Sequence, residues 1–365
     1  SATVVNKAGL IETVGSGEAR IDYKDDSKGA LLLEPTRSNS LLQSNQFNTT
    51  WTLSASIDLT SGKSGVGGSN NAWLLKKSGS GARYIQQTLS LSSAQYSCSF
   101  YLKAESTNWA IIWCYDGTTA SEAYFDLENG VVGNTGGSNF NDATIENVGG
   151  GWYRCTLIYT SSTTFVRVYP AFDNGSVGAN TDDGIYIQNA QLEQGSYATS
   201  YIPTQGGVVT RVVENITQTT PNLSNSQEVT AFIDLGARPV TGINSTSNNF
   251  RLDFGTGNTR IIYNQNGSSN HRIELNINGS ATYYTLSNLL TTTRVKIGVS
   301  VTPTTLVIYA NGVEYHSVSI ASADWSNLLA IETSITESIG NIKINDFKLY
   351  NTALTDSELQ ALTKI

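Results

Sequence analysis

Short runs of alternating apolar and polar residues, rich in β-branched and aromatic side chains, recur along most of the chain. Clusters of Gly, Asn, Asp and Ser separate these runs at regular intervals. Period-two alternation is typical of half-buried β-strands, so the pattern predicts many short strands. Good examples are residues 84–91, 96–103, 109–115, 152–159, 165–170, 295–301 and 306–310.

Two local signals are more specific than the alternation. Asn311-Gly312 lies between two predicted strands and favours a type I′ hairpin turn, which needs positive φ at both central residues. Thr355 and Glu358 have the spacing of a capping box, with apolar residues at helical intervals after them. The sequence therefore predicts an all-β protein, with two antiparallel β-sandwich (jelly-roll or concanavalin-like) domains in tandem and a short C-terminal helix.

The length of 365 residues favours two domains, because single cores seldom grow beyond about 250–300 residues. Pro203 and Gly206-Gly207 precede a polar stretch that lacks core periodicity. We place the boundary there, with one module at residues 1–212 and the other at 213–365.

Charge and hydropathy exclude two classes of partner. The net charge is −8 and no dense Lys/Arg cluster occurs, whereas a nucleic-acid-binding protein needs a basic face. No run of 18 or more apolar residues is present, so membrane insertion is not expected. Cys98, Cys114 and Cys155 are an odd number of cysteines and lie inside apolar runs, so we expect them to be small buried side chains.

Several sequence blocks resemble bacteriophage tail-associated and virion-surface proteins. The opening blocks are residues 6–12, 19–23 and Leu-Leu-Leu-Glu-Pro-Thr-Arg-Ser-Asn at 31–39. The later blocks are Phe-Asp-Leu at 125–127, Gly-Gly-Trp-Tyr-Arg at 150–154, Gln-Leu-Glu at 191–193, residues 198–204 and Thr210-Arg211. The second half is similar to laminin-G/concanavalin-like lectin sandwiches, through residues 306–313 and 344–359.

The resemblance implies a carbohydrate-binding-module-like jelly roll followed by a lectin-like sandwich. It implies a non-catalytic virion protein, in the tail or as capsid decoration, that binds glycans of a bacterial surface. Other virion proteins and a homo-oligomer are further expected partners, and the expected location is the virion surface or the extracellular space. The alternative is a carbohydrate-binding appendage of a secreted bacterial polysaccharide-degrading enzyme or adhesin, secreted or on the bacterial cell surface.

Alternation also divides the first module's side chains between two faces. The three cysteines fall on the inward sets, together with residues such as Phe100, Ile112 and Val168. The opposite face then carries aromatic and arginine side chains, which suit sugar binding. These candidates are Tyr101, Trp113, Tyr115, Arg154, Arg167 and Tyr169. The competing interpretation is that Trp109 and Trp113 cover the second sheet or a folded-over loop.

Fewer candidates occur elsewhere. In the second module, Tyr263, His271, Arg272 and Trp325 are candidates for loop contacts. Asp173, Asp182 and Asp183 flank a Gly/Asn-rich loop and form a candidate structural calcium site, although an ordinary acidic turn has the same residues. No cofactor is required otherwise.

The sequence has no motif of a known catalytic class. It lacks a nucleophile elbow, a phosphate-binding loop and a zinc motif. The strand-borne acidic pattern of sandwich glycanases, which place two carboxylates within about 10 Å, is also missing. We therefore expect a binding protein rather than an enzyme.

Overall fold

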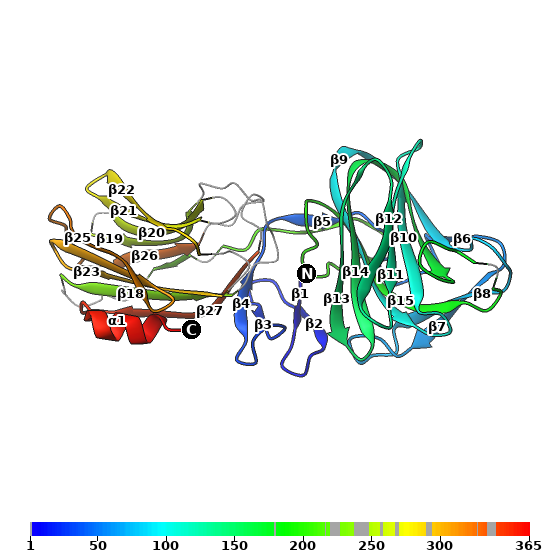
Figure 1. Ribbon diagram of the computed structural model, residues 1–365, viewed down its shortest axis with the longest axis horizontal. Helices are drawn as coiled ribbons and strands as arrows, with labels where there is room; N and C mark the ends of the chain where they lie inside the picture. The colour runs from blue at the N-terminus through cyan, green and yellow to red at the C-terminus, as the bar shows by residue number, and fades with distance from the viewer. Residues whose placement is uncertain are drawn as a thin grey trace. The chain divides into compact units, whose positions relative to one another are not determined.

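The computed structural model describes residues 2–178, 180–215, 217–219, 227–236, 248–255, 258–266, 270–289, 294–326, 328–333 and 341–365. The chain divides into two compact units (Figure 1). The first consists of Ser1–Glu18 and Arg37–Arg211, and the second of Ala19–Thr36 and Val212–Ile365. We had expected each module to be continuous in sequence, at 1–212 and 213–365. The structure instead assigns Ala19–Thr36 to the second unit.

A ten-stranded antiparallel sheet dominates the first unit. Its order is β12-β11-β10-β14-β9-β15-β8-β7, while β13 pairs with β14 and β6 with β9. The strands are β6 (Thr52–Leu53), β7 (Ile57–Lys63), β8 (Ala72–Lys77), β9 (Ile85–Ala104), β10 (Trp109–Tyr115), β11 (Ala120–Asp126), β12 (Val131–Gly136), β13 (Phe140–Gly149), β14 (Trp152–Ala171) and β15 (Gly184–Gln194). Two ribbons complete the unit, β1 (Ala2–Val5) with β2 (Ile11–Val14) and β5 (Arg37–Asn39) with β16 (Val209–Arg211).

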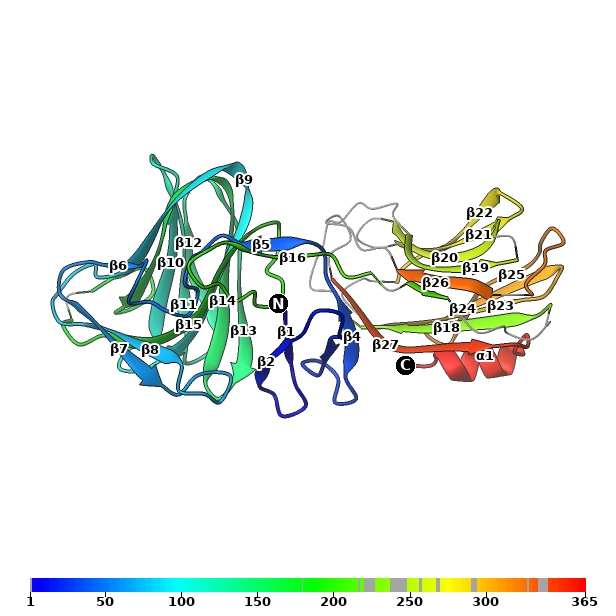
Figure 2. The same ribbon diagram turned by 180° about the vertical axis from the view of Figure 1, so that it is seen from behind.

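The strands β9 and β14 are each 20 residues long and belong to both layers of this unit (Figures 1 and 2). Residues 152–159 of β14 pair with β13, and residues 152–160 pair with 95–103 of β9, whereas residues 165–171 pair with β10. Register shifts between Ser161 and Phe165 separate the two halves, and such irregularities bend a strand. The sheet thus folds into a first layer, β12-β11-β10-β14-β9-β6, and a second layer, β13-β14-β9-β15-β8-β7.

The core of the first unit lies between these layers and confirms the predicted inward sets. Cys98 of the second layer and Cys114 of the first belong to one cluster of buried side chains, so the two layers face one another. The buried residues include Phe100, Leu102, Ala110, Ile112, Cys155, Leu157, Val166 and Val168.

The three cysteines are free and buried, and this gives a chemical prediction. Burial raises the pKa of the Cys98 and Cys155 thiols, and the thiolate is the reactive form. Iodoacetamide at neutral pH should therefore leave all three unmodified in the folded chain and label all three in urea, as measured by mass spectrometry. Rapid labelling of any of them in native buffer would contradict the buried placement.

A buried polar network ties together several of the sequence blocks quoted above. The Asn39 side chain is fully buried and makes four hydrogen bonds. Its Nδ2 donates to the carbonyl oxygens of Ala190 (3.0 Å) and Ile202 (2.9 Å). Its Oδ1 accepts from the amides of Leu41 (3.1 Å) and Leu192 (3.0 Å). The Arg-Ser-Asn and Gln-Leu-Glu blocks therefore fix the closing segment of this unit and have a structural role.

The second unit consists of two antiparallel sheets around one core. Their orders are β17-β26-β19-β20-β21-β22 and β25-β24-β23-β18-β27-β4-β3. The strands are β3 (Ile21–Asp22), β4 (Ala30–Leu33), β17 (Thr217–Thr219), β18 (Val229–Leu235), β19 (Asn248–Phe254), β20 (Thr259–Asn266), β21 (Asn270–Ile277), β22 (Ser280–Leu286), β23 (Val295–Val301), β24 (Thr305–Ala310), β25 (Val313–Ser319), β26 (Leu328–Thr333) and β27 (Ile342–Tyr350).

Both local predictions in the second unit are confirmed. Asn311 and Gly312 join β24 to β25 with φ of 50° and 79°. The helix α1 (Asp356–Thr363) begins after Thr355, whose side chain forms a capping box with Glu358. The all-β fold with sandwich-like domains and a short C-terminal helix is thus as predicted.

Ion pairs attach Ala19–Thr36 to the second unit. Lys343 Nζ of β27 lies 2.6 Å from Asp22 and 2.5 Å from Asp25. Arg20 pairs with Glu34 at 2.8 Å and also with Glu214. Backbone pairing of β4 with β27 continues the sheet, so this early segment is an integral part of the second sandwich.

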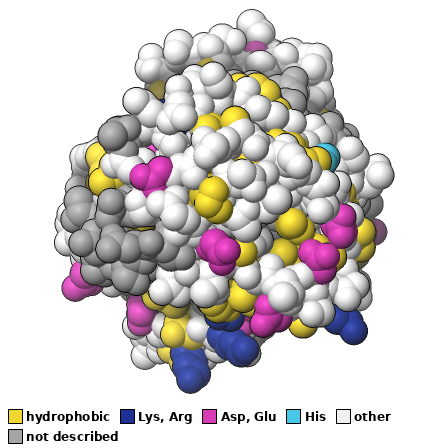
Figure 3. Space-filling view, turned by 90° about the vertical axis from the view of Figure 1, so that its left-hand side faces the viewer, with side chains coloured by type: hydrophobic (Ala, Val, Ile, Leu, Met, Phe, Trp, Pro, Cys, Tyr) yellow, Lys and Arg dark blue, Asp and Glu magenta, His cyan; other side chains and the backbone are white. Residues whose placement is uncertain are grey.

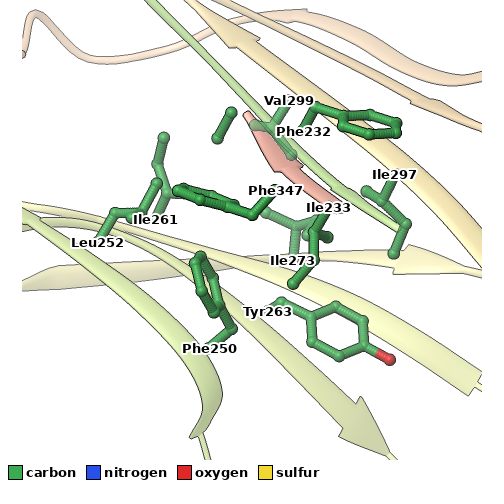
Figure 4. Close-up of a pocket in the computed structure, with 11 residues that line it drawn as sticks. Phe232, Ile233, Phe250, Leu252, Ile261, Tyr263, Ile273, Ile297, Val299 and Phe347 are labelled. Atoms are coloured by element: carbon green, nitrogen blue, oxygen red, sulfur yellow. The ribbon is translucent and has the colours of Figure 1, made fainter. Parts of the chain in front are cut away.

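A small apolar cavity of about 20 Å³ lies between the two sheets of the second unit (Figure 4). The rings of Phe250 and Phe347, with centroids 4.9 Å apart, point toward one another across it. A space of this size holds at most one water, and an apolar lining gives that water few partners. The cavity is a packing gap in the core and has no room for a ligand.

The surface of the second unit seen in Figure 3 is mixed. Hydrophobic atoms form small separate patches among polar ones, with acidic side chains between them and basic side chains at one edge. Among the described residues, no helix has the length and apolar character needed to cross a bilayer.

Candidate functional site

The outer face of the first layer carries a row of functional side chains that cross-strand pairing places side by side. In the antiparallel register Trp113 of β10 is opposite Glu122 of β11 on one side and Arg167 of β14 on the other. Arg167 is in turn opposite Gln86 of β9. Directly opposed residues point to the same face, so the sheet places an acid, an indole, a guanidinium and an amide next to one another.

Three aromatic rings stack at the centre of this row. The Trp113 ring lies 5.2 Å from Tyr115 at 11° and 5.6 Å from Phe165 at 24°. Tyr115 and Phe165 are themselves 4.9 Å apart. All three side chains are partly exposed, although aromatic side chains contribute most to stability when buried. They form a flat apolar surface open to solvent.

Arg167 holds the rings in place. Its guanidinium lies 4.0 Å from the centroid of Tyr84, 4.4 Å from Phe165 and 4.8 Å from Trp113. Its Nε donates to Gln86 Oε1 at 2.7 Å, and its Nη1 donates to the Tyr169 hydroxyl at 3.2 Å. A cation next to the face of an aromatic ring is attracted to it, so Arg167 helps to fix the positions of the three rings around it.

The far end of the same face is closed. Ile111, Tyr124 and Tyr169 are buried there, and Val177 of the loop after β14 packs against them. Burial raises the pKa of Tyr169 to about 12. The accessible part, which we call the aromatic face, is therefore confined to one end and consists of Tyr84, Gln86, Trp113, Tyr115, Glu122, Phe165 and Arg167.

The structure brings together four of the six predicted ligand-binding residues of the first module. Trp113, Tyr115, Arg167 and Tyr169 share the outer face of the first layer, although Tyr169 is only 6% exposed. Trp109 and Trp113, the subjects of the competing packing interpretation, are both partly exposed and both pack against the buried cluster of this face.

Tyr101 and Arg154 do not belong to this site, and their assignment to it was wrong. They lie on the outer face of the second layer, buried at 5% and 8% exposure, and Trp152 and Val66 cover Tyr101. Arg154 lies over the Tyr101 ring and donates to Ser99 Oγ at 3.1 Å. The error arose because β9 and β14 pass through both layers, so the same alternation places residues on two separate surfaces.

The second unit's candidates are mostly core residues. Tyr263 and Trp325 belong to its hydrophobic core, and the Trp325 indole donates to the Thr302 carbonyl at 2.9 Å. His271 is 3% exposed and its Nδ1 bonds the Tyr263 hydroxyl. Arg272 alone remains near the surface, where it lies 4.1 Å from the ring of Tyr283.

The three aspartates do not form the expected calcium site. Asp183 is buried and pairs with Lys77 at 2.9 Å, whereas Asp173 and Asp182 are exposed. Within the described part of the chain, no group of three His, Cys, Asp or Glu residues is placed to hold a metal ion. The acidic turn is the interpretation that these contacts favour.

Sequence reasoning missed Tyr84, Gln86, Glu122 and Phe165. The alternation that selected Arg167 and Tyr169 also includes Phe165, so the sequence could have predicted that residue as part of the site. Gln86 joins the site only through pairing with Arg167, 81 positions away, and Glu122 only through pairing with Trp113, nine positions away. No local pattern marks them.

Comparisons with known proteins give only distant similarity. No known protein family and no curated protein matches the chain. Domain 4 of AbnA, a GH43 extracellular arabinanase from Geobacillus stearothermophilus solved with arabinotriose, is 18% identical over 40% of this chain and 71% of its own, with a TM-score of 0.32.

Two further solved structures are similar at the same level. The CBM40 of Ruminococcus gnavus IT-sialidase, bound to α2,3-sialyllactose, is 13% identical over 38% of this chain and 83% of its own, with a TM-score of 0.30. The SAP-like pentraxin of Limulus polyphemus is 11% identical over 40% and 75%, with a TM-score of 0.33. Similarity this low carries no argument about function.

Proposed function

We propose that the first unit binds a glycan on the aromatic face and that the protein is a non-catalytic carbohydrate-binding protein. The observation that supports this most is the partly exposed stack of Trp113, Tyr115 and Phe165 beside Glu122, Arg167 and Gln86. Sugar rings bind aromatic faces through their C–H surfaces, and flanking polar groups orient their hydroxyls. The site offers both features on one rigid sheet.

The dimensions of the row suit an oligosaccharide. Four adjacent strands, at about 4.8 Å per step, give a width of roughly 14 Å from Glu122 to Gln86. More than one sugar ring fits along it. Because the residues come from paired strands, the surface is ordered before the ligand arrives, which reduces the entropic cost of binding.

The biological context is a separate proposal. A virion protein and an enzyme-borne appendage need the same binding face, and the phage context rests on the sequence resemblance alone. The similar structures named above include domains of an arabinanase and a sialidase, and none of them is from a phage. An adjoining catalytic domain in the gene would indicate the appendage, and neighbouring tail or capsid genes would indicate the virion.

Binding itself is testable with the whole chain on an array of bacterial, plant and animal polysaccharides, followed by calorimetric titration of the hits. We expect saturable binding to at least one glycan. Trp113 lies in the site, so its fluorescence should change on binding. Absence of binding across the array, with circular dichroism showing a folded protein, would contradict the proposal.

A further inference from the structure

Glu122 is the acidic side chain of the aromatic face. It lies on β11, directly opposite Trp113 and next to Gly136 of β12. A methyl group at Gly136 would come within 3.2 Å of Glu122 Oε1, so the glycine keeps that flank of the carboxylate clear. The carboxylate thus borders the indole at the edge of the aromatic face.

The carboxylate also lacks a neutralising neighbour. Within the described residues, no hydrogen bond or ion pair joins it to another side chain, and burial raises its pKa. Its charge raises the pKa of Tyr124 and Tyr169 further, after burial in each case. The field of Glu122 therefore extends over this face.

Arg167, the cation of the same row, does not cancel that charge. Trp113 lies between the two residues in the pairing, and the hydrogen bonds of Arg167 go to Gln86 and Tyr169. Three rings cover its guanidinium. The arginine is engaged in ordering the surface, whereas Glu122 has acceptor capacity to spare.

We propose, on the basis of the glycan-binding function, that Glu122 contacts the ligand and makes the site selective for uncharged, hydroxyl-rich sugars over uronic, sialic or sulfated ones. A sugar stacked on Trp113 donates its hydroxyls to the carboxylate and completes its hydrogen bonding. An anionic group in that position meets an unneutralised like charge in a partly buried place, where screening is weak.

Matched glycans that differ only in charge test this inference. The probes are oligogalacturonate and its methyl ester, and a β-1,4-glucan oligosaccharide and its C6-oxidised uronate, titrated calorimetrically against the full chain. We expect the uncharged member of a pair to bind at least about tenfold more tightly, and the difference to shrink in about 0.5 M salt.

The variant Glu122→Gln keeps the shape and one acceptor but removes the charge. It should weaken binding of the neutral probe about tenfold, because hydrogen bonds to charged groups are the stronger ones. It should also reduce the ratio of the affinity for the neutral probe to that for its acidic partner by at least about fivefold. Glu128→Gln is the matched control, since Glu128 is exposed and its carboxylate bonds Asn108 outside the row; we expect no change in the ratio.

The outcomes separate this inference from the proposed function. Acidic probes that bind as tightly as their neutral partners, or a ratio unchanged in Glu122→Gln, overturn the selectivity and leave glycan binding intact. A chain that binds no probe here and no glycan on the array overturns both.

Discussion

Replacing Trp113 with alanine is expected to weaken glycan binding by about 1–3 kcal/mol, roughly 5- to 150-fold in affinity. The indole is the centre of the row, stacked on Tyr115 and Phe165 and next to Arg167. Its removal takes away the largest flat surface for a sugar ring and loosens the rings beside it. Calorimetric titration of the best glycan from the array measures the loss.

Two controls make this result specific. Trp113→Phe keeps a smaller ring and should retain intermediate affinity. Tyr283→Ala removes an aromatic side chain that is 53% exposed on the second unit and should leave affinity unchanged. If Trp113→Ala binds normally while thermal unfolding shows an intact fold, the aromatic face is not the binding site.

Arg20→Ala is expected to lower the free energy of unfolding of the second unit by about 3–5 kcal/mol. Removing one member of a buried ion pair takes away the attraction that offsets the desolvation of the other. The side chains of Arg20 and Glu34 are only 2% and 1% exposed, and their charged atoms are 2.8 Å apart. Without the arginine, Glu34 and Glu214 both lose the guanidinium that their carboxylates contact. Urea unfolding followed by circular dichroism measures the change.

The double variant Arg20→Met with Glu34→Leu separates charge from packing. An apolar pair of similar volume often replaces a buried ion pair at little cost, so much of the lost stability should return. An unaltered urea midpoint in Arg20→Ala would show that the ion pair does not hold this segment in place.

Local sequence signals predicted the local structure well. The Asn311-Gly312 hairpin and the Thr355–Glu358 capping box are decided by residues within one turn of each other, and both formed. Alternation also identified the inward-facing side chains of the first unit, because the sequence of each strand by itself shows which of its two sides is apolar.

Local patterns did not predict how long the strands are or which layer each segment joins, because long-range strand pairing decides both. The sequence predicts 84–91 and 96–103 as two strands, and 152–159 and 165–170 as two more, with a polar stretch between the members of each pair. In the structure each pair is one strand, β9 or β14, because pairing between β9 and β14 continues through the polar stretch in each of them. Alternation thus predicted that Arg154 and Arg167 lie on the outward side of their strand, but not that they belong to different layers of the sandwich.

The placement of Ala19–Thr36 has the same cause. Lys343 and Asp22, which pair at 2.6 Å, are 321 positions apart, and no periodicity in either segment refers to the other. Only the assembled sheet shows that they are partners.

The position of β4 between β27 and β3 imposes an order on biosynthesis. The residues of the first unit have all been made once Arg211 leaves the ribosome, whereas β4 must wait for Ile342–Tyr350 before its open edge is filled. An unpaired strand edge can recruit other chains, so the nascent second sandwich is exposed to misassembly until β27 has been made. A fragment that begins at residue 213 leaves one edge of β27 unpaired, because it lacks β4.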